Sequence, residues 1–242
     1  MSAIQVLPFI TTTVILVFAF LVLRRYSQRG SLHNLFWGIG LVMYGLGTLA
    51  EALLAITYSP FILHGWYLFG ALLTPAWLGQ GTVQLLVRRK QVTNTLVVIL
   101  IIATVIAALK VYSLPTDDAL YKIGVTVSAQ YKDVMPRDTF TVILLSVFAM
   151  YGTLTLVGGA LYSAYIFLRK RIMPQRVLGN VFIAIGGLSP ALGGTLTARG
   201  LGDYLFVSEL IGAVLLFIGF RLATTQQPVE APPAPHPAAT SA

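Results

Sequence analysis

Residues 1–23, MSAIQVLPFITTTVILVFAFLVL, contain no charged side chain, and Arg24 and Arg25 follow at once. A helix that crosses a bilayer needs about 20 mostly apolar residues, so this stretch predicts a membrane-spanning helix. Because a backbone in lipid must satisfy its own hydrogen bonds, similar runs elsewhere predict further helices. The predicted fold class is an all-α, seven-transmembrane-helix bundle with spans at about residues 3–23, 32–57, 61–86, 92–112, 140–168, 177–198 and 204–222.

The overall composition agrees with this prediction and argues against other classes of protein. Of the 242 residues, 57% are apolar and 10% are charged, whereas about a quarter of the residues in a soluble domain are charged. Together with a mean hydropathy of +0.82, this excludes a soluble globular domain and a disordered chain. The absence of cysteine excludes disulfides, thiol catalysis and thiolate metal sites.

The distribution of lysine and arginine predicts the orientation. Cytoplasmic loops are enriched in these residues, and eleven of the sixteen fall on one side of the predicted membrane: Arg24, Arg25, Arg29, Arg88, Arg89, Lys90, Arg169, Lys170, Arg171, Arg176 and Arg221. The other side carries five basic and five acidic residues, which cancel. We therefore expect an outside N-terminus, a cytoplasmic C-terminus and a place in the plasma (inner) membrane. The net charge of +8 is then a topology signal, and no nucleic-acid partner is expected.

Two segments lie outside the predicted spans. Residues 113–138 form a polar outer loop, which is either a cap over an outer vestibule or a solvated connection. Residues 225–242 hold five prolines together with Ala, Thr and Gln, a composition that predicts a disordered cytoplasmic tail.

An internal repeat is visible in the sequence. After a shift of 146 residues, residues 32–49 align with residues 178–195 and share seven identities in eighteen positions. The alignment predicts a first three-helix repeat (1–86), a linker helix (87–112) and a second three-helix repeat (139–224). A single linker span keeps both repeats in one orientation, so the plan is a 3+1+3 parallel repeat. Convergent Gly and Leu composition is the alternative explanation.

The 3+1+3 plan resembles, in topology only, the PQ-loop and sugar-transporter families and the opsins. The Pro-Gln pair of PQ-loop proteins is absent, and the last span has no lysine to bind retinal. The motifs GALLTPAWLG (residues 70–79) and RVLGN (residues 176–180) are similar to uncharacterised seven-pass bacterial integral membrane proteins. That resemblance implies a seven-pass fold and no particular activity.

Paired glycines mark the second and sixth spans. Gly40 and Gly47 are seven residues apart, as are Gly186 and Gly193, which places each pair on one helix face. Small residues let helices approach closely in lipid. We therefore expect tight helix packing at both pairs, with a ligand groove as the alternative.

Two carboxylates inside predicted spans are the sharpest functional signal. Glu51 and Glu209 each lie about six residues from the outer end of a span, roughly 9 Å deep at 1.5 Å per residue. Intramembrane acids are costly and usually face a bundle interior or a wet cavity. Tyr44 shares a helix face with Glu51. The two acids are either a proton-coupling or cation-binding site, or structural groups that each bond to a neighbouring Tyr, Thr or Arg199 or extend toward the outer surface.

Three amides extend this hypothesis toward the cytoplasmic side. Asn34 and Asn180 occupy equivalent positions in the two repeats, and Gln80 adds polarity at similar depth. They are candidates to line the inner half of a substrate path. Helix capping or interhelical hydrogen bonding explains the two asparagines equally well.

The leading functional hypothesis is a small-solute or ion transporter with a polar path between the repeats. Its partners would be the lipid bilayer, a small polar solute or proton, and a second copy or another membrane protein. The alternative is a non-transporting sensor or accessory subunit. We expect no enzyme, because HExxH and GxSxG are absent and the GxGD motif at residues 200–203 lacks a second aspartate on the preceding span. No cofactor is expected, since His33 and His64 fall at opposite membrane faces.

Overall fold

The computed structural model describes residues 3–171, 173–197, 199 and 204–224, and these residues form helices and connections without a β-strand. Within this part of the chain, seven helical spans are long and apolar enough to cross a membrane. The prediction of an all-α chain with seven long apolar helices is therefore confirmed. The seven spans indicate a multi-pass membrane protein. The predicted tail and the GxGD motif lie outside the described residues.

The spans lie close to their predicted positions. The first is α1 (Ala3–Arg29), the second α2 (Leu32–Leu54) and the fourth α5 (Lys90–Tyr112). The third joins α3 (Pro60–Gly65), η1 (Trp66–Leu73) and α4 (Thr74–Leu86). The fifth joins α7 (Thr139–Gly152), η3 (Thr153–Val157) and α8 (Gly158–Arg169). The sixth and seventh are α9 (Pro174–Thr197) and α10 (Tyr204–Thr224). The largest difference is in the first span, which continues as helix through the basic cluster to Arg29.

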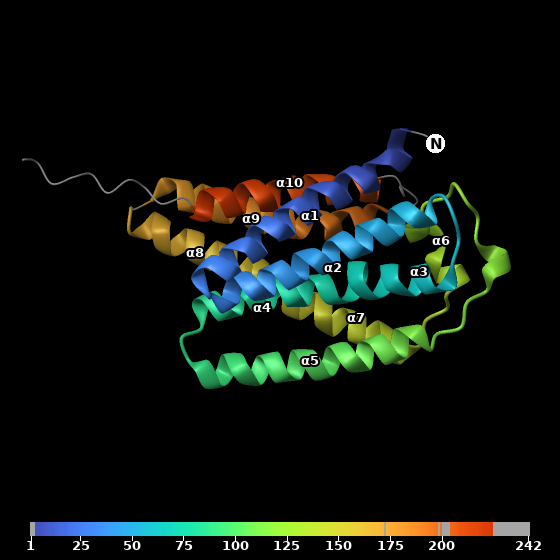
Figure 1. Ribbon diagram of the computed structural model, residues 1–242, viewed down its shortest axis with the longest axis horizontal. Helices are drawn as coiled ribbons and strands as arrows, with labels where there is room; N and C mark the ends of the chain where they lie inside the picture. The colour runs from blue at the N-terminus through green and yellow to red at the C-terminus, as the bar shows by residue number, and fades with distance from the viewer. Residues whose placement is uncertain (1–2, 172, 198, 200–203, 225–242) are drawn as a thin grey trace, which may run out of the picture.

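Six spans pack as a ring, and the fourth lies outside it (Figure 1). Helix α1 packs against both α2 and α10, and α2 packs against η1 and α4. Helix α4 packs against α7 and η3, η3 and α8 pack against α9, and α9 packs against α10. Helix α5 touches the ring along the third and fifth spans, and few of its residues are buried. The interior of the bundle therefore lies among spans that come from both ends of the chain.

Two spans contain π-helical turns, which the sequence analysis did not predict. Segment η1 precedes Pro75, and segment η3 lies in the middle of the fifth span. The backbone N–H of Thr74 donates to the oxygen of Phe69, five residues earlier, and the Thr74 hydroxyl donates to the same oxygen at 2.7 Å. Pro75 has no N–H to continue the α-helical ladder. Such π turns frequently occur at functional sites.

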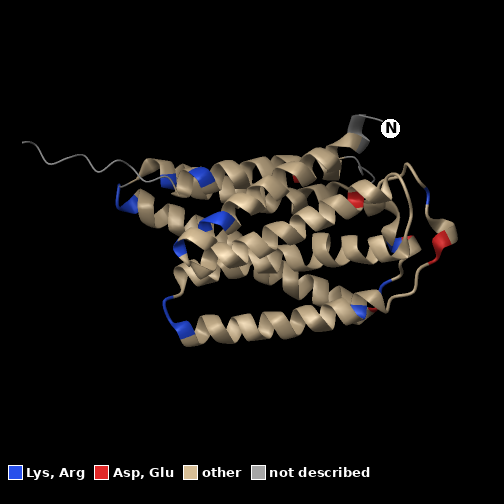
Figure 2. Cartoon of the chain, in the orientation of Figure 1, with Lys and Arg blue, Asp and Glu red and all other residues tan. Residues whose placement is uncertain are grey.

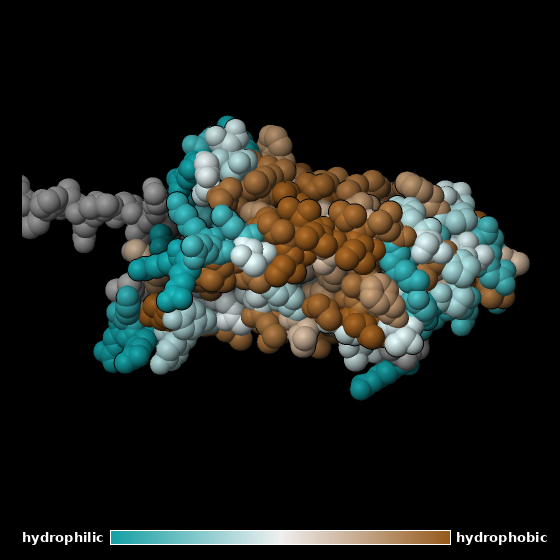
Figure 3. All heavy atoms as spheres, turned by 90° about the horizontal axis from the view of Figure 1, so that it is seen from below, coloured by the Kyte–Doolittle hydropathy of each residue, from teal (hydrophilic) through white to brown (hydrophobic). Residues whose placement is uncertain are grey.

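Charge is distributed unevenly between the two ends of the bundle. The basic residues of the predicted cytoplasmic side gather at one end, while the other end carries both acidic and basic residues (Figure 2). A belt of apolar side chains separates two hydrophilic ends on the face shown in Figure 3. This pattern is the one expected of a protein that spans a bilayer.

The paired glycines lie at close contacts between neighbouring helices. A Cβ atom on Gly47 would lie 2.5 Å from Gly70 Cα, and one on Gly40 would lie 2.8 Å from the backbone nitrogen of Leu78. A Cβ atom on Gly186 would lie 2.8 Å from the backbone nitrogen of Leu216. The predicted tight packing at these glycines is therefore confirmed. The glycines of the second span thus contact the third span, and those of the sixth span contact the seventh.

The outer loop is folded onto the end of the bundle. It contains the short helices η2 (Asp118–Leu120) and α6 (Val127–Val134). The Gln130 side chain bonds to backbone atoms of Lys122 and Val125 at 2.8–3.0 Å. The Tyr121 hydroxyl donates to the oxygen of Leu54 at 2.6 Å. The Tyr121 bond holds the loop against the end of α2, and the Tyr131 ring of α6 lies 5.2 Å from the Trp66 ring of the third span.

Candidate functional site

The two intramembrane carboxylates come together at the junction of the two predicted repeats. Glu51 projects from α2 and is 2% exposed. Glu209 projects from α10, and the two side chains lie within hydrogen-bonding reach of each other. Tyr44 lies on the same face of α2 as Glu51, seven residues earlier. Its hydroxyl donates to the backbone oxygen of Glu209 at 3.0 Å. Three side chains therefore join α2 to α10, although 165 residues separate Tyr44 from Glu209.

Apart from each other, the carboxyl groups have few partners. Within the described residues, no other side chain or backbone group donates a hydrogen bond to either oxygen of Glu51. The same is true of Oε2 of Glu209. Within the same residues, neither carboxylate has an ion-pair partner. Buried charges in proteins are normally paired with an opposite charge. This pair is an exception, and such exceptions need a chemical explanation.

The contact itself limits the charge of the pair. An ionised carboxylate only accepts hydrogen bonds, so a hydrogen bond between two carboxyl groups needs a proton on one of them. Two negative charges in contact inside a membrane bundle would also repel each other strongly. The geometry therefore suits a pair that holds one proton, or one that holds a cation in its place.

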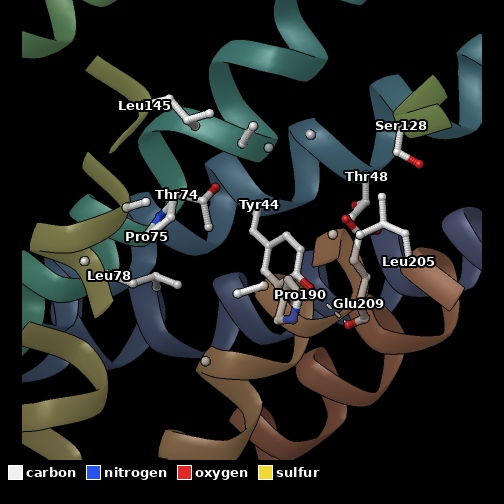
Figure 4. Close-up of a pocket in the computed structure, with 18 of the residues that line it drawn as sticks. Tyr44, Thr48, Thr74, Pro75, Leu78, Ser128, Leu145, Pro190, Leu205 and Glu209 are labelled. Atoms are coloured by element: carbon white, nitrogen blue, oxygen red, sulfur yellow. Dashed lines mark hydrogen bonds between the residues drawn. The ribbon is translucent and has the colours of Figure 1, made fainter. Parts of the chain in front are cut away.

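A cavity of about 400 Å³ lies beside the pair. Its walls come from α2, η1, α4, α7, η3, α9 and α10, and α6 closes its outer end. Most of the lining is apolar, while Tyr44, Thr48 and Glu209 form a polar corner. Figure 4 shows Tyr44 reaching from α2 toward Glu209, with Pro190 beside them. Glu51 is not part of the lining.

Aromatic rings and a guanidinium group gather at the end of this cavity that α6 lines. Trp66, Tyr67 and Tyr131 line it, and the Trp66 and Tyr131 rings are 5.2 Å apart. The Arg137 guanidinium lies 4.8 Å from the centre of the Tyr131 ring and 5.8 Å from that of Tyr67. Both rings therefore present their faces to a cation.

Tyr121 lies next to the carboxyl pair on the outer side. Burial, and after it the nearby Glu51 carboxylate, raises the pKa of Tyr121 to about 12. The Tyr121 hydroxyl therefore stays protonated at neutral pH and can serve only as a neutral hydrogen-bonding group. Its own hydrogen bond goes to the Leu54 backbone.

The three predicted amides lie apart from the cavity. The Asn34 amide donates to the Ser31 hydroxyl at 2.6 Å, and the Asn180 amide donates to the oxygen of Arg176 at 2.8 Å. Both bonds are local to one helix end. Gln80 is fully buried, where its amide donates to the oxygen of Thr93 at 3.5 Å and its oxygen accepts from the Tyr151 hydroxyl. Tyr44, Glu51 and Glu209 thus share one site, while the inner half of the path stays a prediction.

Several cavity residues escaped the sequence analysis. Trp66 and Tyr67 lie in the π turn η1, and no periodic pattern in the sequence predicts such a turn. Ser128 and Tyr131 lie on α6, in a segment for which a solvated connection was one of two interpretations. A signal was present there, because Val127, Tyr131 and Val134 follow the i, i+4, i+7 spacing of an amphipathic helix.

Comparison with known proteins adds no assignment to this geometry. The chain matches no protein-family model, no curated protein and no solved structure. The functional argument therefore depends on the site alone.

Proposed function

We propose that this protein transports a small solute or ion across the membrane, coupled to protons through Glu51 and Glu209. The observation that carries the proposal is the contact between two carboxyl groups beside a cavity, with three of their four oxygens lacking any other partner within the described residues. Intramembrane ionisable groups that face a cavity commonly mark substrate paths and proton relays. A purely structural pair would normally have an opposite charge or several donors as partners.

The arrangement of the ring supports a path between two repeats. If span one corresponds to span five, two to six and three to seven, each helix contact in one repeat has a counterpart in the other. The contacts of α1 with α10 and of α4 with η3 are then also equivalent. Helix α5 stays outside this scheme, as a linker would. The cavity and the carboxyl pair lie between the two proposed halves, where transporters built from repeats bind their substrates.

The alternative function, a sensor or accessory subunit, predicts a dry bundle with an apolar, partner-shaped outer face. A cavity of about 400 Å³ with a carboxylate in its wall favours transport over that alternative. We propose further that the chain is not an enzyme and needs no cofactor, and that its N-terminus lies outside the plasma membrane.

The orientation can be tested by cysteine labelling, since the chain has no native cysteine. Lys122→Cys on the outer loop and Lys170→Cys at the opposite end should react with a membrane-impermeant maleimide from opposite sides of intact cells or spheroplasts. Labelling of Lys122→Cys from outside and of Lys170→Cys only after lysis supports the orientation. The reverse pattern, or labelling of both from one side, contradicts it.

Transport can be tested in proteoliposomes that enclose a pH-sensitive dye. Small organic cations, sugars, amino acids and carboxylates are added one class at a time across an imposed pH gradient. We expect at least one class to move protons through the parent protein and not through Glu51→Gln or Glu209→Gln. Asp133→Asn, which removes an exposed acid from α6, is the matched control and should transport normally. Equal proton movement in parent, variants and empty liposomes for every class would overturn the proposal.

A further inference from the structure

We propose that the cavity binds a small organic cation, with its ammonium group at Glu209 and its apolar body against the cavity walls. This inference rests on the proposed function and names the substrate class of the same site. The cation would take the place of the proton held between Glu51 and Glu209. One proton would leave for solvent as one cation enters, so the net charge of the site would not change.

The charge of the site selects against other solutes. Glu51 is an unpartnered side chain, more than nine-tenths buried, and it points at the carboxyl group in the cavity wall. An anion placed at Glu209 would add a further negative charge in a low-dielectric region, which is strongly unfavourable. A cation at the same place supplies the opposite charge that the pair lacks.

The rest of the cavity selects against a bare metal ion. Away from the polar corner its walls are mostly apolar, as at Leu78, Leu145 and Leu156, with separate hydroxyl groups such as those of Ser128 and Thr197. A hard cation takes six or more oxygen ligands close together, and hydroxyl groups spread over apolar walls do not form such a set. The apolar walls do suit the hydrocarbon part of an organic cation, and about 400 Å³ lies within the roughly 300–1,000 Å³ typical of small-molecule sites.

Aromatic side chains add a second source of cation affinity. Tyr44 stands beside Glu209, and Trp66 and Tyr67 line the cavity from η1. Alkylammonium groups bind favourably over such rings, most of all over Trp. Arg137 already uses the faces of Tyr67 and Tyr131 in this way. The Ser128 hydroxyl, which has no partner within the described chain, lines the same cavity and can bond to a polar group of the ligand.

Other titratable groups also face the cavity or the pair. They are Tyr44 on α2, Tyr67 on η1, Tyr121 on the outer loop, and Tyr131 and Lys132 on α6. The Tyr121 hydroxyl stays protonated at neutral pH, because its pKa is raised to about 12. Lys132 is exposed and carries a positive charge at the cap, so it opposes the entry of a cation without reaching the buried pair. Removing that charge should therefore strengthen cation binding.

The test is calorimetric titration of the full chain in detergent with three benzyl or phenyl probes. Benzyltrimethylammonium is the cation, benzyl alcohol the neutral comparator and benzenesulfonate the anion. We expect the cation alone to bind measurably, to release close to one proton per cation, and to bind up to about tenfold more weakly for each unit fall in pH where the pair titrates. Tighter binding of benzyl alcohol or benzenesulfonate, or no binding of the cation, would overturn the inference.

Variants separate the site from general partitioning into the micelle. Glu209→Gln should weaken cation binding at least about tenfold, and Asp133→Asn should leave it unchanged. Glu51→Gln keeps the Glu209 carboxylate, so it should still bind the cation while releasing little or no proton. Lys132→Gln should bind the cation a few times more tightly. Parent-like binding and proton release in both Glu variants, each first shown to unfold cooperatively on heating, would refute the site.

The outcome distinguishes this inference from the transport proposal. Cation binding with the predicted variants but no flux in proteoliposomes would leave the site standing and refute transport. Proton-coupled flux of another solute class, without cation binding, would refute the organic-cation site and leave transport standing.

Discussion

Gly47→Ala tests the helix contact that forms one wall of the cavity. Gly47 on α2 faces Gly70 on η1, and a Cβ atom on Gly47 would lie 2.5 Å from the Gly70 Cα and 2.7 Å from its nitrogen. Ordinary van der Waals contact begins at 3.4 Å, so the two backbones must separate by about an ångström. The obstacle is backbone on both sides, which a rotamer change cannot relieve.

The cost follows from the packing that this separation disturbs. Overpacking a well-packed interior typically costs about 1–3 kcal/mol, and a gap of 0.5–1 Å around the new methyl group loses a quarter to a half of each dispersion contact. Alanine is favoured over glycine in a helix by about 0.5–1 kcal/mol. We therefore expect a net loss of about 1–2 kcal/mol in the free energy of unfolding.

Gly158→Ala is the matched control. Gly158 is also helical, and its added Cβ would have no heavy atom within 4 Å beyond its own neighbourhood. This variant should gain about 0.5–1 kcal/mol from helix propensity alone. Thermal unfolding in detergent, followed by circular dichroism, should place Gly47→Ala roughly 4–10 °C below Gly158→Ala, at about 2–4 °C per kcal/mol. Equal melting temperatures would show that α2 and η1 do not meet as described.

Two further predictions concern the ends and the interior of the bundle. The Lys110 ammonium at 2.7 Å, followed by hydrogen bonds from Thr141, lowers the pKa of Asp138 from 3.8 to about 2. The stabilisation from the ionised Asp138 should therefore be complete above about pH 4 and disappear as the pH falls through about 2. The melting temperatures of the parent and Asp138→Asn should converge over that range. A constant difference would contradict the ion pair. Tyr151→Phe leaves the buried Gln80 oxygen without its donor and should lower the free energy of unfolding by about 1–3 kcal/mol. The control is Tyr165→Phe, at a side chain 57% exposed, which should change that free energy by less than about 0.5 kcal/mol. Equal effects of the two substitutions in a thermal melt would count against the buried bond.

The membrane-spanning helices could be predicted closely from the sequence because their cause is local. Lipid tolerates only long apolar helices, so charge-free runs mark the spans directly. The sequence also placed Glu51 and Glu209 at equal depth on faces that carry small or polar neighbours, but it left open whether the two side chains meet. That reasoning needs only the rise per residue of a helix and the free-energy cost of exposing an acid to lipid.

Other features depend on contacts that no single segment determines. The π turn before Pro75 needs the Thr74 side chain to bond to the Phe69 oxygen, a choice that helix periodicity does not reveal. Asn34 and Asn180 are aligned by the 146-residue shift of the sequence, yet each amide bonds within its own helix end. The rotation of a helix about its axis decides whether such an amide lines a path or bonds at its own helix end. Matching positions in the sequence do not determine that rotation.

The two π turns lie in the third and fifth spans, which are neighbours in the ring but do not correspond under the proposed repeat. A π turn replaces the regular backbone ladder with a wider one that can revert to α-helix by a shift of one residue. Backbone irregularity is therefore concentrated in two neighbouring spans that both line the cavity, and the opposite wall is interrupted by Pro190 within α9. A change of shape around the cavity should thus begin at the two π turns, and the two proposed halves should move unequally.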